Sequence, residues 1–470
     1  MTSAFIVCDL GFGDAGKGLV TDALVRATGA AVVVRYNGGA QAGHNVVTPD
    51  GRHHTFAQLG AGSFVEGVQT FLTRDVLVHP TALLREASRF DAEVGSSGSG
   101  SVLDRLWVSE GARVITPYHQ ALNRLRELAR GAATHGTCGV GVGETARDAL
   151  EAPDEVLVMG DLARPTVLRR RLARARERLL PEARSLAAQA GAIDAVSLER
   201  SIFERDEVLG RWEDAIAPWV ARQRIVGDAH LRSLPGAERP LIFEGAQGVL
   251  LDEAHGFHPH TTWSDCTPGN AERLLAELGL PHGPVRVGVL RSHAVRHGPG
   301  PFPSETAELE GQVLEHNARN AWQGRVRYGW FDDVLARYAL ECIGGVEHLA
   351  LTHLDLLPRR GRLARVVGYR EGAGQGAQGS YWAAGEVGRR LRTPEVASLA
   401  YQEALGGFLG SGLTPELVDA RDEATFVEGI QCALGVEVTL RSRGPSATAV
   451  ELGGGLAARL MSEARQATWQ

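Results

Sequence analysis

The stretch GFGDAGKG, residues 11–18, decides the fold, because it stands between an apolar run and a helix-forming segment. The preceding residues 4–9, AFIVCD, are predicted to form a buried strand, and a helix is predicted from about Leu19 to Ala27. A glycine loop between a strand and a helix lets backbone N–H groups approach phosphate oxygens at the positive end of the helix. The stretch therefore predicts a phosphate-binding loop of the P-loop-NTPase-like kind.

The loop contains an unusual cation. Of the 49 Lys and Arg residues in the chain, Lys17 is the only lysine. A codon bias toward arginine would leave one lysine by chance, but a compact ammonium acts on phosphate as a point charge, which a guanidinium does not reproduce. We therefore interpret Lys17 as functional. A P-loop places a hydroxyl after its lysine to hold Mg²⁺, whereas Gly18 and Leu19 follow here, so Asp14 is the nearest candidate metal ligand.

Further apolar runs bounded by turns predict more buried strands. These are residues 30–36, 76–78, 241–243, 285–290, 349–352 and 436–440. The second of the predicted strands near the N-terminus runs into another glycine-rich loop, NGGAQAGHN at 37–45. Strand, glycine loop, helix and strand in this order predict an α/β fold with a large, mostly parallel central sheet flanked by helices.

A helical region interrupts this pattern. Residues 167–190 and 197–226 carry apolar side chains at helical spacing with charges between them. The arginines of 169–178 alternate with Leu, Ala and Glu, which favours the solvated face of a helix over a nucleic-acid patch. We expect a single domain over residues 1–470, with a helical insertion at about 165–234.

Composition narrows the class of protein. The net charge of −7 argues against a general nucleic-acid binder. The five cysteines are scattered without a C-x-x-C pair, which favours a reducing compartment. No basic leader opens the sequence, and no apolar run approaches the roughly 18 residues that span a bilayer. We expect a cytoplasmic enzyme without a membrane or nucleic-acid partner.

Motifs along the chain resemble those of the adenylosuccinate synthetase family. GDAGKG is similar to that family's G-D-E-G-K-G, and RYNGGAQAGHNVV to R-[YF]-x-G-G-x-N-A-G-H-T-V. FEGAQGVLLDEAHGFHPHTT (243–262) follows F-E-G-A-Q-G-T-L-L-D-x-x-x-G-T-Y-P-Y-V-T. Later segments resemble further family motifs in the same order: GPGPFPSE (298–305), GRVRYGWFD (324–332), LTHLD (351–355) and SRGP (442–445). The motifs cover nearly the whole chain.

The resemblance implies a Mg²⁺-dependent, homodimeric ligase that consumes GTP. The family reaction converts IMP, L-aspartate and GTP to adenylosuccinate, GDP and phosphate, through transfer of a phosphoryl group to the purine 6-oxygen. The small molecules implied as partners are therefore GTP, a purine nucleotide and an amino acid.

The resemblance also implies roles for individual residues. Asp14 corresponds to the base for purine N1 and to a metal ligand, and the carbonyl of Gly43 to a second metal ligand. His44 corresponds to the imidazole that stabilises phosphate charge, and Gln247 to the amide at the 6-oxo group; Lys17 completes the catalytic set. The implied GTP-binding residues are Gly13, Gly16, Lys17, Gly18, Asp355, Gly444 and Pro445. Of these, Asp355 corresponds to the carboxylate that binds the guanine N1–H and 2-amino group. The implied substrate-binding residues are Gln41, Thr137, Thr262, Arg325 and Arg327.

Departures from the family pattern cluster around the purine phosphate and the amino donor. Cys138, Val140 and Ala149 stand where the family has Thr, Arg and Lys, and a downstream Arg is missing near Ala152. The substrate-site replacements elsewhere are Gln41 for Asn, Trp263 for a small serine, and Trp322 and Gln323 for two threonines.

These departures predict a divergent paralogue with an altered purine or amine substrate. Arg325 and Arg327 are retained guanidinium forks that suit a carboxylate, so aspartate remains the favoured donor. Two alternatives stay open: an ordinary housekeeping adenylosuccinate synthetase, and a catalytically weak GTP-binding regulator.

Overall fold

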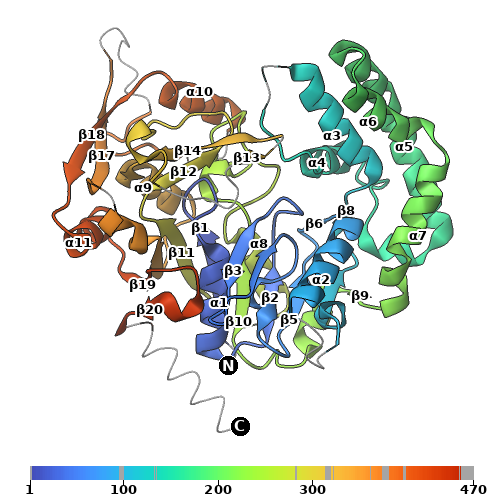
Figure 1. Cartoon of the computed structure of the whole chain (residues 1–470), viewed down its shortest axis with the longest axis horizontal. Helices are drawn as coiled ribbons and strands as arrows, with labels where there is room; N and C mark the ends of the chain where they lie inside the picture. The colour runs from blue at the N-terminus through green and yellow to red at the C-terminus, as the bar shows by residue number, and fades with distance from the viewer. Residues whose placement is uncertain are drawn as a thin grey trace.

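A ten-stranded sheet forms the centre of the molecule (Figure 1). The computed structural model describes residues 3–94, 100–131, 133, 135–280, 283–312, 319–320, 322–359, 361–372, 381–394, 398–454 and 456. The strand order is β20-β19-β16-β11-β1-β10-β2-β5-β7-β9. The bounds are β1 (Ala4–Asp9), β2 (Val32–Arg35), β5 (Gln69–Leu72), β7 (Leu106–Ser109), β9 (Ile225–Val226), β10 (Leu241–Glu244), β11 (Val285–Arg291), β16 (His348–Thr352), β19 (Val438–Ser442) and β20 (Val450–Leu452). All neighbours run parallel except β19 and β20, which confirms the predicted sheet.

Strand β1 lies in the middle of this sheet and is buried along its whole length. Phe5 and Val7 face the helix α1 (Lys17–Thr28), where they share a core with Leu24. Ile6 faces the opposite side and shares a second core with Leu274 of α8 (Gly269–Glu277). Burial on both faces is the reason that the strand reads as a continuous apolar run rather than an alternating one.

Smaller sheets and helices surround the central sheet. The small sheets contain β3 (His44–Val47) with β4 (His53–Phe56), β6 (Leu77–Val78) with β8 (Arg113–Val114), β12 (Ala294–His297) with β14 (Gly324–Gly329) and β13 (Arg319–Asn320), and β15 (Phe331–Asp332) with β17 (Ala364–Arg370) and β18 (Thr414–Asp419). The remaining longer helices include α2 (Pro80–Val94), α3 (Pro117–Arg130), α4 (Val142–Glu151), α9 (Asp333–Cys342), α10 (Leu399–Leu409) and α11 (Glu423–Leu434). The strand predicted at 76–78 thus belongs to a two-stranded sheet outside the central one. In the described residues, no helix is long and apolar enough to cross a membrane.

The region predicted to be helical contains α5 (Pro165–Ala190), α6 (Asp194–Glu204) and α7 (Glu207–Arg222). They stack beside α3 and α4 on the side of the molecule opposite β17 and β18 (Figure 1). Helix α5 buries Leu168 and Leu172, while the Arg169 side chain is 69% exposed and paired with Glu213, as expected for a solvated face. The helical prediction is wrong at its end, because Ile225–Val226 form β9, the edge strand that pairs with β7. The division into one domain with an insertion stays a prediction.

Charged and polar residues gather where the parallel strands end. Asp9, Arg35, Glu244, Arg291 and Thr352 are the last residues of β1, β2, β10, β11 and β16, which are neighbours in the sheet. Ligands of open α/β sheets bind outside the carboxyl ends of the strands. This edge is therefore the candidate functional site.

Candidate active site

Asp9 organises the glycine loop that follows it. Its Oδ1 accepts a hydrogen bond from the Gly11 N–H at 2.8 Å, and its Oδ2 accepts from the Ala15 N–H at 3.0 Å. Lys17 Nζ lies 2.8 Å from the same Oδ2, and the lysine is only 3% exposed. The carboxylate thus ties the loop and the first residue of α1 together. Asp9 is a site residue that was not predicted, although it is an acid at the end of a buried strand, directly before a glycine loop.

The backbone of this loop adopts conformations that suit glycine. Gly13 and Gly16 have φ angles of 89° and 94°, and Asp14 between them has a φ of 56°. A left-handed non-glycine residue costs roughly 1–3 kcal/mol and persists only where its surroundings hold it. Arg291 provides such support, because its Nη1 donates to the Asp14 carbonyl at 3.1 Å. Asp14 is therefore held at the tip of the loop by contacts outside the loop.

The Asp14 carboxylate is ionised at neutral pH. Its Oδ2 lies 2.7 Å from His297 Nε2, and its side chain is 36% exposed. Burial raises the pKa of Asp14, but the hydrogen bond from His297 and the positive charges of His297, Lys17 and Arg291 outweigh that effect and lower the pKa to about 2. The group is therefore available as a base or a metal ligand.

His44 lies against the first turn of α1. A Cβ on Gly18 would lie 2.8 Å from the His44 Cβ, so only glycine permits this approach. His44 Nδ1 lies 2.6 Å from Glu244 Oε1, and Glu244 Oε2 accepts from the Ala61 N–H at 2.9 Å. The two predicted glycine-rich segments thus meet at one place, and Glu244 is a further residue that sequence reasoning missed.

The charge states in this pair fix the histidine tautomer. Burial raises the pKa of Glu244, but Arg35 and His44 outweigh it, so the pKa lies below its ordinary value and the carboxylate is ionised. Burial lowers the pKa of His44 despite the opposing effect of Glu244. A neutral imidazole must then donate from Nδ1 to Glu244, which leaves Nε2 as the nitrogen that this pair does not use.

Two amide side chains next to these groups have unsatisfied polar atoms. Gln247 has a φ of 56°. Its Oε1 lies close to Gly38, because a Cβ added to that glycine would be 2.9 Å from this oxygen. The Gln247 Oε1 and both amide atoms of Gln41 are buried without a hydrogen-bond partner in the described structure. Buried polar atoms are normally paired. In the described residues, these atoms therefore have hydrogen-bonding capacity that the protein itself does not use.

The end of β16 connects the predicted guanine site to the phosphate loop. Thr352 Oγ1 donates to the Ala15 carbonyl at 2.7 Å, and Asp355 follows in a short 3₁₀ helix, Leu354–Arg359. On the neighbouring strand β19, Ser442 Oγ donates to the Gly444 carbonyl at 2.8 Å. Asp355 and the segment of Gly444 and Pro445 thus follow adjacent strands at the same edge of the sheet.

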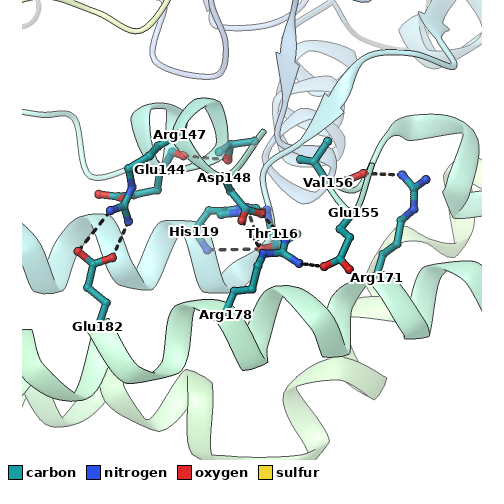
Figure 2. Close-up of polar contacts among 12 residues, drawn as sticks. Thr116, His119, Glu144, Arg147, Asp148, Glu155, Val156, Arg171, Arg178 and Glu182 are labelled. Atoms are coloured by element: carbon teal, nitrogen blue, oxygen red, sulfur yellow. Dashed lines mark hydrogen bonds and ion pairs between the residues drawn. The ribbon is translucent and has the colours of Figure 1, made fainter. Parts of the chain in front are cut away.

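The wall formed by α3, α4 and α5 contains ion pairs between arginines and carboxylates, among them those of Arg147 and Arg178 (Figure 2). Arg147 Nη2 lies 2.9 Å from Glu144 and 2.6 Å from Glu182. The other arginines of α3 and α4 are also paired: Arg124 with Glu199, Arg126 with Glu144 and Glu182, and Arg130 with Glu127. The arginines of these two helices therefore have carboxylate partners already.

Two tryptophans from other segments contact the glycines at the start of this wall, and Thr137 lies in the loop that leads into it. A Cβ on Gly143 would lie 3.0 Å from Trp263 Cδ1, and the Trp263 side chain faces solvent with 46% exposure. The Trp322 ring contacts Gly139 in the same way. Thr137 accepts from Asn123 Nδ2 at 3.1 Å. Apolar rings thus flank the glycines where the resemblance implies a phosphate site.

Comparison with known protein families covers all of the site segments described above. The family model for adenylosuccinate synthetase matches residues 6–450. The chain belongs to the adenylosuccinate synthetase family. It is 33% identical over 376 residues to the adenylosuccinate synthetase of Pseudomonas paraeruginosa, covering 78% of this chain and 81% of that one. It is 34% identical over 373 residues to that of Thioalkalivibrio sulfidiphilus, covering 77% and 79%.

Solved structures show the same fold. Fully ligated adenylosuccinate synthetase from Plasmodium falciparum superposes with a TM-score of 0.71 at 20% identity, covering 96% of this chain and 99% of that one. Cyanophage S-2L succinoaminodeoxyadenylate synthetase bound to dGMP and dATP gives a TM-score of 0.58 at 18% identity, covering 98% and 99%. The chain is thus a GTP-consuming, C–N bond-forming ligase of this family, and the resemblance found in its motifs is confirmed.

The residues present fit a magnesium ion, the metal that the resemblance in the sequence motifs implies. No group of three or more His, Cys, Asp and Glu side chains suited to a metal occurs in the described ranges. Mg²⁺ in nucleotide enzymes is commonly held by one or two protein oxygens together with substrate phosphates. The ionised, partly exposed Asp14 at the tip of the loop meets that requirement, and the Gly43 carbonyl is the second oxygen that the resemblance implies.

Arg325 and Arg327, which the resemblance implies as ligands of the amino donor, differ in exposure and in the contacts that they make. Arg325 is 67% exposed and pairs with Glu310 at 3.2 Å. Arg327 Nε donates to Glu305 at 3.0 Å, and its Nη1 donates to the carbonyls of Gly298 and Gly300 at 3.2 and 2.9 Å. The guanidinium of Arg327 is thus largely occupied by the protein, whereas Arg325 reaches into solvent. Their role toward a donor carboxylate stays a prediction.

Proposed function

We propose that the protein uses GTP to phosphorylate the 6-oxo group of a purine and then replaces the resulting phosphate with an amine, aspartate being the favoured donor. The observation that supports this most is the meeting of Asp14, Lys17 and the His44–Glu244 pair at the carboxyl ends of neighbouring strands. Oxide leaves carbon poorly, whereas phosphate leaves well, so phosphoryl transfer to the oxygen makes displacement by an amine feasible.

The residues of the site divide the tasks of this scheme among them. Asp14 accepts the N1 proton, and the electron pair released moves through the ring to O6, which attacks the γ-phosphorus as GDP leaves. Lys17 stabilises the charge on the phosphate oxygens. His44 does so once its Nε2 has taken up a proton from solvent beside the phosphate, and Glu244 at Nδ1 stabilises the imidazolium. Gln247 donates to the 6-oxygen. Mg²⁺ bound by Asp14 and Gly43 would neutralise further phosphate charge. The amine then attacks C6, phosphate leaves, and the amine nitrogen loses a proton.

GTP is proposed as the phosphoryl donor because Asp355 can accept from the guanine N1–H and 2-amino group, which adenine lacks. A site with an unpaired buried acceptor discriminates strongly against the wrong base. We expect Asp355→Asn to lose activity with GTP and to gain activity with xanthosine triphosphate, whose 2-oxo group suits an amide donor. Initial rates with the three nucleoside triphosphates measure this. Equal use of ATP by the wild type would show that the guanine assignment is wrong.

The proposed acceptor differs from IMP at its 5′-phosphate end. The wall of α3 and α4 presents guanidinium groups that are already paired with carboxylates, and Val140 and Ala149 supply no charge. A charge-assisted hydrogen bond contributes about 1.5–3 kcal/mol. Loss of two such contacts weakens binding by on the order of a hundredfold or more. A 6-oxopurine nucleoside, or a nucleotide altered near the phosphate, is therefore the proposed acceptor class.

A screen of GTP-dependent phosphate release tests this acceptor proposal. We expect release to require both a 6-oxopurine and an amine, and we expect the Michaelis constant for IMP to exceed that of the better acceptor by about a hundredfold. Arg147→Met is the matched control, because Arg147 is engaged with Glu144 and Glu182 and its loss should leave the ratio between nucleoside and nucleotide unchanged.

The alternatives give different results in the same screen. A low-micromolar Michaelis constant for IMP with aspartate would restore the ordinary housekeeping reaction. A selective loss of IMP use in Arg147→Met would show that this arginine binds the phosphate after all. GTP hydrolysis that needs no purine co-substrate would instead identify a GTP-binding regulator.

A further inference from the structure

His297 contacts the proposed catalytic base although no motif pointed to it. It is the last residue of β12, and its Nε2 lies 2.7 Å from Asp14 Oδ2. The side chain is 19% exposed, so it lies at the margin of the site rather than in the core. The phosphate loop and β12 are nearly 300 residues apart in the sequence, and this contact joins them.

The turn after His297 is held rigidly. Arg296 is 1% exposed and donates from Nε to the Pro299 carbonyl and from Nη1 to the Pro301 carbonyl, both at 3.1 Å. Arg327, its cross-strand partner on β14, donates to the carbonyls of Gly298 and Gly300. Two guanidinium groups thus bind four successive carbonyls, which fixes the chain directly after His297.

The same clamp reaches the phosphate loop. The Arg296 guanidinium lies 4.4 Å from the ring centre of Phe12, two residues before Asp14. Its Nη2 donates to the His260 carbonyl at 3.1 Å, and a Cβ on Gly300 would come within 2.2 Å of that nitrogen. The position of His297 relative to the loop is therefore set by packing on several sides, so its contact with Asp14 does not depend on that one hydrogen bond.

A carboxylate at a loop tip can rotate about its side-chain bonds unless a partner fixes it. The Asp14 backbone is fixed by its left-handed conformation and by Arg291, and His297 fixes one carboxylate oxygen. With Oδ2 engaged, Oδ1 is the oxygen left to face a ligand. The imidazole therefore selects one orientation of the carboxylate.

We propose that His297 is a positioning residue that holds the Asp14 carboxylate in the orientation in which Oδ1 accepts the purine N1 proton. This inference rests on the proposed function, in which Asp14 is the base. The proton moves from N1 to Oδ1, and the N1 electron pair moves toward O6. His297 keeps its own proton throughout and only orients the acceptor. Misplacing a reacting group by about 1 Å can cost on the order of a hundredfold in rate.

Three variants test this role. His297→Leu removes the donor at similar volume, and we expect kcat to fall by about 10- to 100-fold while the Michaelis constant for GTP stays within about twofold. His297→Gln places an amide N–H near the position of Nε2 and should recover most of kcat. His297→Ala should be partly rescued by added imidazole, which a role in packing alone would not produce.

Two results would overturn the proposal: wild-type kcat in His297→Leu, or an equal loss in the Leu and Gln variants without imidazole rescue of the Ala variant. Asp14→Asn, measured alongside, separates this proposal from the proposed function. If Asp14→Asn is inactive and His297→Leu is fully active, the base stands and the positioning role fails. If Asp14→Asn is active, the base assignment fails, and the role of His297 fails with it.

Discussion

Lys17→Arg is expected to abolish turnover while the fold is retained. Lys17 Nζ bonds to Asp9 Oδ2, and that carboxylate also binds the loop N–H groups of Gly11 and Ala15. A guanidinium is planar, longer and branched, so it cannot occupy the position of a compact ammonium inside this glycine-lined loop. The loop backbone that Asp9 holds in place would then be displaced. We expect a loss of roughly two or more powers of ten in kcat, as for removal of a key electrostatic stabiliser.

Controls for Lys17→Arg separate charge from shape. Lys17→Met leaves Asp9 buried without a counter-charge, which costs about 3–5 kcal/mol, so both stability and activity should fall. Arg26→Lys, at the exposed end of the same helix, keeps its pair with Asp22 and should behave as wild type. Single-turnover phosphate release and thermal melting of the three variants give the comparison. Activity near that of wild type in Lys17→Arg would refute the inference drawn from the lone lysine.

The central sheet could be predicted because its strands are buried on both faces. Runs such as AFIVCD and LIFE contain the information locally, since apolar residues on consecutive positions fit a buried parallel strand. Ile225–Val226, in contrast, were wrongly predicted as helix, because the local pattern around them is helical. Two residues at the edge of a sheet give no periodicity of their own, and the helical pattern of α7 runs directly up to them.

The candidate site was predictable only where residues near in sequence act together. The glycine loop and the GHN segment were identified because glycines and polar residues stand side by side there. Asp9 and Glu244 act through contacts with other segments, and an acid at the end of a strand has many possible uses. His297 shows the limit most clearly, because its partner Asp14 lies nearly 300 residues earlier.

Asp14→Asn is expected to retain the fold and nucleotide affinity and yet to lose amine transfer almost completely. The amide has the shape of the carboxylate, and its oxygen can still accept from His297 Nε2. The supports of the left-handed backbone remain, because Arg291 bonds to the main-chain carbonyl. The variant therefore removes the ability to take up a proton with little change in geometry. Asp14→Ala removes the oxygen ligand as well and should also lose Mg²⁺-dependent GTP binding.

A carboxylate with a pKa of about 2 is a weak base, so Asp14 can act only if proton removal is coupled to another step. Since the pKa is lowered, Asp14 is ionised throughout the neutral range, and activity should show no loss from its protonation until the pH falls toward that value. In the ground state such a carboxylate does not remove a purine N1 proton. Phosphoryl transfer to O6 makes that proton far more acidic, so deprotonation and transfer must proceed together.

The measurement for Asp14→Asn is the rate of product formation at saturating GTP. Because proton removal and phosphoryl transfer are coupled, loss of the base should also stop phosphate release, even though GTP still binds. A rate within about tenfold of wild type would correspond to only ~1.4 kcal/mol in the barrier. That is too little for a group that accepts the transferred proton, and the activation step would then need another residue or an acceptor that arrives without an N1 proton.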